Sequence, residues 1–129
     1  MIEIKIETKH KEELVDITPS IESAVKKLGV IHGNAVIFCP HTTAGLTINE
    51  NADPDVRTDI IAGLNSIGFE KLKFRHYEGN SPAHIKASMM GFSLFVIIEN
   101  GKPVLGKWQG IYFCEFDGPR SRKIFFNML

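Results

Sequence analysis

The chain has 129 residues, 43% of them hydrophobic, which is typical of one globular domain. Its formal net charge is zero, and this argues against a general nucleic-acid binder because phosphate contacts need a basic face. No apolar run reaches membrane-spanning length and no signal peptide is visible, so we expect a cytoplasmic protein without a membrane partner. The two cysteines, Cys39 and Cys114, lie in apolar runs and are predicted to be buried free thiols.

Residues 2–8 alternate between apolar and polar side chains and predict a half-buried strand. Three later segments share one helix pattern, in which a capping residue and a proline come first and a glycine comes last. We expect the capping side chain to accept a free backbone N–H, the proline to occupy the first turn, and the glycine to provide a left-handed exit. The three helices are predicted to run from Thr18-Pro19 to Gly29, from Asp53-Pro54 to Gly68, and from Ser81-Pro82 to Gly91.

The remaining apolar segments predict strands, and Asn100-Gly101 predicts a hairpin turn between two of them. Strands are mixed with helices and end in a β-meander, which indicates an α+β fold with mixed or antiparallel sheets and about three helices. Residues 1–129 form a single domain in this interpretation. The strands are expected at residues 35–39, 46–49, 94–98, 109–116 and 122–128.

Polar side chains follow the two strands that precede the second helix. His41 stands with Thr42 and Thr43 in a loop after an apolar strand, a position where binding groups concentrate. A lone histidine there is structural about as often as it is functional. Glu50 is free to ligate a hard cation or to act as a base, whereas Asp53 is explained as a helix cap.

The densest polar cluster runs from His76 to His84. His84 falls in the first turn of the third helix, where the positive end of the dipole disfavours imidazolium and favours an anion or a neutral, metal-ready ring. The spacing from His76 to His84 is not a typical zinc spacing. Near the C-terminus, Arg120, Arg122 and Lys123 fit either a phosphate site or a solvated turn. Core packing is the expected role of Trp108, with a ligand platform as the alternative, and His10 and His32 are interpreted as surface residues.

Taken together, these segments resemble the YjbQ family, a group of small uncharacterised proteins. The resemblance covers almost the whole chain, in the family's order. The segments that carry it are His41–Leu46, Ile48–Asp53, His76 with Glu78–Asn80, Ala83–Ser88, Gly91, and Leu105–Tyr112. The chain departs from the family pattern at Lys107, at Phe116-Asp117, and at Ser81-Pro82, where the family usually has an acidic pair.

The resemblance implies an α+β homotrimer in which three histidine segments converge on a polar site associated with a metal ion or an oxyanion. It also implies secondary thiamine-phosphate synthase activity, in which a thiazole phosphate displaces pyrophosphate from hydroxymethylpyrimidine diphosphate. For that activity we predict His41, Glu50 and His84 as catalytic residues. The predicted contacts to the small phosphorylated substrate are Thr42, Thr43, Asn49, Asn80 and Arg120, and the predicted ligands of a divalent metal, Zn or Mg, are His41, His76 and His84.

Two other functions remain open on the same residues. A histidine cluster with an open coordination position also suits a protein that holds a metal or a phosphorylated metabolite without turnover. A metal-dependent hydrolase, with Glu50 or Glu78 as the base, is the third possibility.

Overall fold

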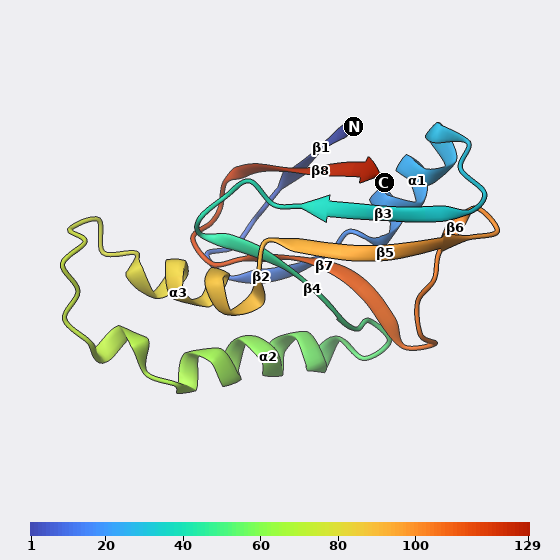
Figure 1. Ribbon diagram of the computed structural model, residues 1–129. Coiled ribbons are helices and arrows are strands. Elements are labelled where there is room, and N and C mark those ends of the chain that lie inside the picture. The colour runs from blue at the N-terminus through green and yellow to red at the C-terminus, as the bar shows by residue number, and fades with distance from the viewer.

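The chain folds into two antiparallel β-sheets, three α-helices and one short 3-10 helix, shown in a computed structural model that describes residues 1–129 (Figure 1). The five-stranded sheet has the order β1-β8-β3-β5-β6, and the three-stranded sheet has the order β2-β7-β4. The α+β prediction is therefore confirmed. The strands are β1 (Ile2–Glu7), β2 (Glu13–Asp16), β3 (Gly33–Phe38), β4 (Ala44–Glu50), β5 (Ser93–Glu99), β6 (Lys102–Pro103), β7 (Gln109–Glu115) and β8 (Ser121–Met128).

The helices occupy the segments that the proline and glycine pattern predicts, but only one has the expected cap. Asp53 accepts the backbone N–H of Asp55 at 2.9 Å, whereas Ile17 and Asn80, which precede the other two helices, make no capping bond. Thr18 instead accepts the N–H of Ile111 at 2.8 Å, so a tertiary contact replaces the predicted cap. The helices are α1 (Thr18–Leu28), α2 (Pro54–Ser66), the 3-10 helix η1 (Phe69–Lys71) and α3 (Ser81–Met90).

The C-terminal strands do not form the expected single β-meander. Strand β7 pairs with β2 and β4 in the small sheet, and β8 pairs with β1 and β3 in the large one. Residues 110–115 of β7 are all buried, whereas β8 alternates between buried and half-buried positions. The two strands therefore belong to different layers, and the turn between them joins the sheets.

The small sheet is the middle layer of the molecule. Ile111 and Phe113 pack into a core cluster with the large sheet and with Ile21 of α1. The alternate β7 residues, Tyr112 and Cys114, pack into a second cluster with Ala83 and Ala87 of α3, and with α2 side chains at its edge. This alternation places α2 and α3 on the far side of the small sheet, as Figure 1 shows.

Three predictions about single side chains can be judged from the fold. Cys39 and Cys114 are buried free thiols, and His10 and His32 are exposed, both as predicted. The expected core packing of Trp108 is wrong. Its side chain is 55% exposed, and the Lys107 ammonium lies 4.8 Å from the centre of its ring. Among the helices, none has the length and apolar character needed to span a bilayer.

Candidate functional site

His41 is held at the point where the β3–β8 ladder ends. The ladder stops with Phe38 opposite Phe125, and continuing it would place Pro40, which has no N–H, opposite Lys123. The His41 ring takes the vacant place, with Nε2 lying 3.0 Å from the Lys123 nitrogen and 3.1 Å from its carbonyl oxygen. In either tautomer the Lys123 peptide engages Nε2, which leaves Nδ1 for another partner.

The environment of His41 favours its neutral form. Burial lowers the pKa of the ring, and the positive charge of Arg122 lowers it further, against an opposing contribution from the Lys123 backbone. A neutral ring offers Nδ1 either as one N–H donor or as one lone pair. His41 is therefore able to donate a hydrogen bond to an anion or to accept a proton.

A buried ion pair between the two sheets lies beneath His41. Arg122 of β8 donates from Nε to Glu115 Oε1 at 2.9 Å and from Nη2 to Oε2 at 2.5 Å. The same Nη2 donates to Thr43 Oγ1 at 2.8 Å. The side chains of Arg122 and Glu115 are only 6% and 0% exposed. The guanidinium is thus fixed in place, and Nη1 makes no hydrogen bond within the chain.

Glu115 is ionised because its hydrogen bonds outweigh its burial. Burial alone raises the pKa of this carboxyl, but bonds from Arg122, Thr8 and the Asp117 backbone bring it below the ordinary value. An ionised Glu115 accepts only, so it holds Arg122 in one orientation. Thr43 accepts from Arg122, and its own hydroxyl proton is consequently free for a ligand.

Helix α3 brings His84 and Asn80 to the same region. Gly45 of β4 allows the close approach, because a Cβ there would lie 2.7 Å from the carbonyl oxygen of Gly91 and 3.2 Å from that of Ala87. The amide of Leu46 also donates to the Gly91 carbonyl at 3.0 Å. The strand that follows His41 is therefore the strand against which the His84 helix packs.

These elements enclose a polar cavity of about 360 Å³ without hydrophobic lining residues. Six of the residues predicted for the site line it. Three further residues that line it are Glu78, Asp117 and Arg122. From the sequence alone, Arg122 fitted a solvated turn as well as a phosphate site. The complete lining is Pro40, His41, Thr42, Thr43, Glu78, Asn80, His84, Asp117, Arg120 and Arg122.

Arg120 is already hydrogen-bonded to Asp117. Its Nη2 lies 2.9 Å from Asp117 Oδ2, its Nε donates to the Asp117 carbonyl at 2.7 Å, and 53% of its side chain is exposed. Arg120 is therefore a weaker candidate for an anion contact than the buried Arg122.

His76 lies beside His84 rather than in the same cavity. The two rings are 5.4 Å apart in an edge-to-face arrangement, and His76 lines an adjoining hollow with Phe74 and Ile85. Within the chain, no three His, Cys, Asp or Glu side chains are placed to hold a metal ion. The predicted ligand set of His41, His76 and His84 is thus not assembled by a single chain.

Glu50 and Asn49 lie away from the cavity. They end β4 opposite the start of β7, whereas Ala44, next to the cavity loop, begins the strand. Seven residues of strand span about 20 Å. The Asn49 side chain accepts the Glu50 backbone N–H at 2.7 Å, and the Glu50 carbonyl accepts from the Tyr112 hydroxyl at 3.0 Å. A single chain does not bring these two residues to His41.

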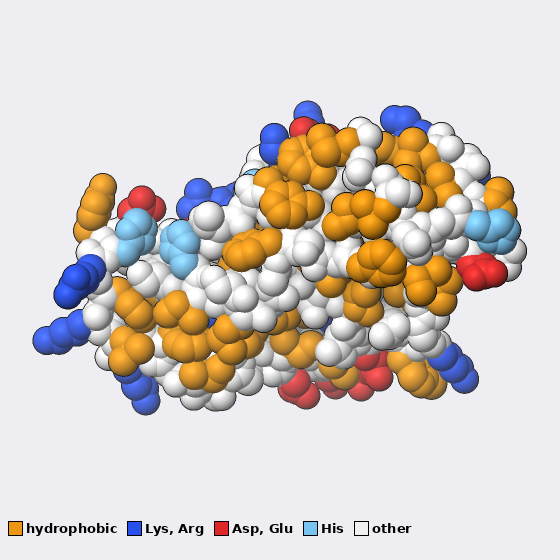
Figure 2. Space-filling view, in the orientation of Figure 1, with side chains coloured by type: hydrophobic (Ala, Val, Ile, Leu, Met, Phe, Trp, Pro, Cys, Tyr) orange, Lys and Arg blue, Asp and Glu red, His pale blue; other side chains and the backbone are white.

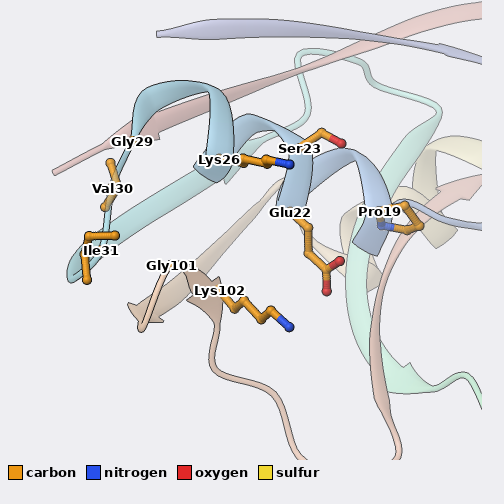
Figure 3. Close-up of a pocket in the computed structure, with 9 residues that line it drawn as sticks. All are labelled: Pro19, Glu22, Ser23, Lys26, Gly29, Val30, Ile31, Gly101 and Lys102. Carbon is orange, nitrogen blue, oxygen red and sulfur yellow. The ribbon is translucent and has the colours of Figure 1, made fainter.

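The largest hollow of the molecule, about 470 Å³, lies between α1 and the turn before β6 (Figure 3). Glu22 and Lys26 come from one side and Lys102 from the other. No buried polar group faces it, and none of the predicted site residues belongs to it. Its size alone does not make it a better candidate than the His41 cavity.

The sequence profile described as "UPF0047 protein YjbQ-like" matches residues 2–129. The chain belongs to the YjbQ family. A UPF0047 protein of Methanocaldococcus jannaschii is 54% identical over 129 residues, covering 100% of this chain and 94% of that protein. The UPF0047 protein YugU of Bacillus subtilis is 50% identical over 127 residues, covering 98% of this chain and 96% of that protein.

Solved structures of similar proteins share the whole fold. An uncharacterized conserved protein of this family from Clostridium acetobutylicum matches with a TM-score of 0.96 at 55% identity, covering 100% of both chains. A conserved hypothetical protein from Thermus thermophilus matches with a TM-score of 0.93 at 37% identity, also over 100% of both chains. The predicted family membership is confirmed.

Proposed function

We propose that the His41 cavity binds the phosphate groups of a small phosphorylated substrate. The observation that carries this proposal is the buried Arg122, which Glu115 fixes below the cavity and which orients the Thr43 hydroxyl. Donors held in one position before the ligand arrives stabilise developing negative charge more effectively than mobile surface side chains. His41 and His84 add two further donors on the same lining.

The reaction that we propose for this site is the secondary thiamine-phosphate synthase reaction. The thiazole nitrogen of the thiazole phosphate forms a bond to the methylene carbon of hydroxymethylpyrimidine diphosphate. The carbon–oxygen bond to the diphosphate breaks, and pyrophosphate leaves with the electron pair. The chain's contribution is to stabilise the charge on the departing pyrophosphate through Arg122, Thr43, His41 and His84. We expect this chemistry in the cytoplasm, where Cys39 and Cys114 stay reduced.

Of the two predicted metals, magnesium fits this proposal and zinc does not. Magnesium is usually held by one or two carboxylates together with substrate phosphates. Glu78, which lines the cavity with a 58% exposed side chain, is the carboxylate available for it, since Asp117 is engaged by Asn80 and Arg120. Zinc held by three histidines does not fit one chain, as no such group is assembled.

Isothermal calorimetry with pyrophosphate tests the binding step. We expect Thr43→Val and His84→Leu each to weaken pyrophosphate binding about tenfold, since each removes one charge-assisted hydrogen bond. Arg57→Met is the control for the loss of a hydrogen-bond donor outside the cavity, because Arg57 lies over the Tyr112 ring and lines no part of the cavity. Absence of pyrophosphate binding in the unaltered protein would refute the site.

Formation of thiamine phosphate from the two precursors tests the reaction, with complementation of a thiamine auxotroph as the cellular measurement. We expect product from the unaltered protein and a loss of at least tenfold in kcat for His84→Leu. If pyrophosphate binds but no product forms, the enzyme assignment is wrong and the binding site stands. The protein would then hold a phosphorylated metabolite without turnover.

We also propose that the protein is a homotrimer. Two patches of exposed large apolar side chains, here called the two faces, are visible in Figure 2, one over β3, β5 and β8 and one around α2 and α3. A two-fold dimer needs one self-complementary face, whereas a closed ring needs two different ones. The first face includes Phe38, Phe95 and Ile97, and the second includes Ile67, Leu72, Phe74 and Met89.

Light scattering after gel filtration measures the assembly. We expect three times the 14.4 kDa mass of one chain for the unaltered protein. Phe95→Lys and Met89→Lys, one on each face, should each give the single-chain mass, because a heterologous ring loses every contact when either face is charged. A dimer, or insensitivity to either change, contradicts the proposal.

A further inference from the structure

Asn80 has a buried oxygen without a partner. Its Nδ2 donates to Asp117 Oδ2 at 3.0 Å, but its Oδ1 makes no hydrogen bond. It is the only side-chain nitrogen or oxygen in the chain that has neither a hydrogen bond nor contact with solvent. Asparagine at this position of a helix normally caps it by accepting a backbone N–H. Here the side chain turns to Asp117 instead, and α3 has no side-chain cap.

The chemistry of Asp117 determines which end of the amide is unpaired. Asp117 Oδ2 also accepts from Arg120 Nη2 at 2.9 Å. Burial alone raises the pKa of Asp117, but the bonds from Asn80 and Arg120 hold it below the ordinary value, so the group is an acceptor only. The amide must therefore present its NH2 to Asp117, and Oδ1 must face the other way.

Asn80 stands between two adjoining cavities. The His41 cavity of about 360 Å³ and a second cavity of about 300 Å³ share Glu78, Asn80 and Asp117 as lining residues. On the His41 side, the free groups of Arg122 and Thr43 are donors. Asn80 thus lines both cavities, and its Oδ1 is a buried acceptor that no hydrogen bond uses.

A buried carbonyl oxygen without a hydrogen bond is a destabilising feature that natural proteins rarely keep. Asn80 could not be improved by rotation, since Asp117 fixes its amide. A group on the ligand that donates to Oδ1 would remove this cost on binding. The free energy gained would then distinguish ligands that have such a donor from ligands that lack it.

We propose that Asn80 is a specificity-determining residue whose Oδ1 accepts a hydrogen bond from a neutral N–H or O–H group on the non-phosphate part of the ligand. The site would then select phosphorylated molecules that carry such a donor. This inference rests on the proposed phosphate-binding function of the same cavity.

Calorimetry with matched phosphate esters tests this inference. The probes are ω-hydroxyalkyl phosphates of two to four carbons, each paired with its ω-methyl ether, which cannot donate. At one chain length we expect the alcohol to bind about fivefold more tightly than its ether, as one neutral hydrogen bond contributes on this scale. In Asn80→Leu the ratio should fall below about twofold, while the affinity of the ether stays unchanged.

Asn100→Gly serves as the matched control, since Asn100 is exposed in the β5–β6 turn at φ 51°, a conformation that glycine adopts freely. It should keep the full preference for the alcohol. Asn80→Ala replaces Asn80→Leu if the leucine variant does not fold. Equal affinities of alcohol and ether in the unaltered protein, or a preference that survives in both Asn80 variants, would overturn the inference while phosphate binding stands. If neither the esters nor inorganic phosphate binds, the proposed function and this inference both fail.

Discussion

The structure predicts that removing Glu115 destabilises the fold more than removing Arg122, although the two side chains form one ion pair. Glu115 receives five hydrogen bonds, from Thr8 Oγ1, from the backbone N–H groups of Phe116 and Asp117, and two from Arg122. Arg122→Met leaves a buried carboxylate with three neutral donors still in place. Glu115→Leu leaves a buried guanidinium without its carboxylate and the Asp117 N–H without an acceptor, whereas Thr8 Oγ1 and the Phe116 N–H keep the carbonyls of Arg120 and Thr43.

Removal of one partner of a buried pair costs about 3–5 kcal/mol. We place Arg122→Met near the lower limit of about 3 kcal/mol, since its partner keeps three bonds. Glu115→Leu belongs near the upper limit of about 5 kcal/mol, which approaches the total stability of many small domains. The double variant has no buried charge, so it should recover about 2 kcal/mol or more relative to Glu115→Leu.

Urea unfolding at pH 7 and one fixed protein concentration measures these differences, with the concentration held constant because an oligomer gains stability by mass action. The reasoning is refuted if Arg122→Met costs less than about 1 kcal/mol, or if the two single effects simply add in the double variant. Acid provides a second check. Because the folded pKa of Glu115 is lowered from 4.5, its contribution is complete above pH 4.5 and is lost as the pH falls through the folded value.

Three further expectations concern packing and pH. Gly45→Ala should destabilise the fold by about 1–3 kcal/mol and weaken pyrophosphate binding, because the added Cβ would collide with the backbone of α3 and Gly91. Gly63→Ala is the control in the same urea series. Gly63 lies inside α2, and a Cβ there would have no atom within 4 Å, so this change should stabilise the fold slightly. Lys86→Met should cost about 3 kcal/mol by thermal unfolding, since this 3% exposed ammonium lies 2.7 Å from Glu12 Oε2. Because folding lowers the pKa of His41, the unfolded chain binds a proton at a higher pH than the folded chain does. The free energy of unfolding should therefore fall as the pH drops below 6.5, and it should fall less in His41→Gln.

The helices were predictable because their ends depend on local chemistry. Proline lies in the first turn of α1, α2 and α3, and Gly29 ends α1 at φ 65°. The caps were less predictable, since a hydroxyl such as that of Thr18 has more than one possible partner. The amide of Ile111, 93 residues away, is the partner that Thr18 takes, and no local pattern specifies it.

The strands were predictable as strands, but their partners were not. Alternation of apolar and polar residues tells which face is buried and says nothing about which strand lies alongside. The continuous apolar run of β7 was the signal that separates it from β8, since a strand covered on both faces has no polar side. Such a run excludes a meander in which β7 and β8 share one half-solvated sheet.

The candidate site was predictable in its residue types but not in its geometry. His41 meets the Lys123 peptide across 82 residues, through a register that spacing does not reveal. Arg122 was recognisable in principle, because in β8 it shares the buried face with Ile124 and Phe126. A charged residue on that face predicts a buried partner, and Glu115, inside an apolar run, is the matching acid.

The buried Arg122–Glu115 pair is also an argument that the His41 cavity binds an anion. Apolar side chains of similar volume fill a buried position at least as well as an ion pair does, so stability alone does not explain the pair. What apolar side chains cannot supply is a fixed donor at the floor of a polar cavity. Glu115 uses Nε and Nη2 of Arg122, and Nη1 stays uncommitted. Stability alone does not explain why Nη1 has no hydrogen-bond partner within the chain. An anion in the His41 cavity would accept a hydrogen bond from it.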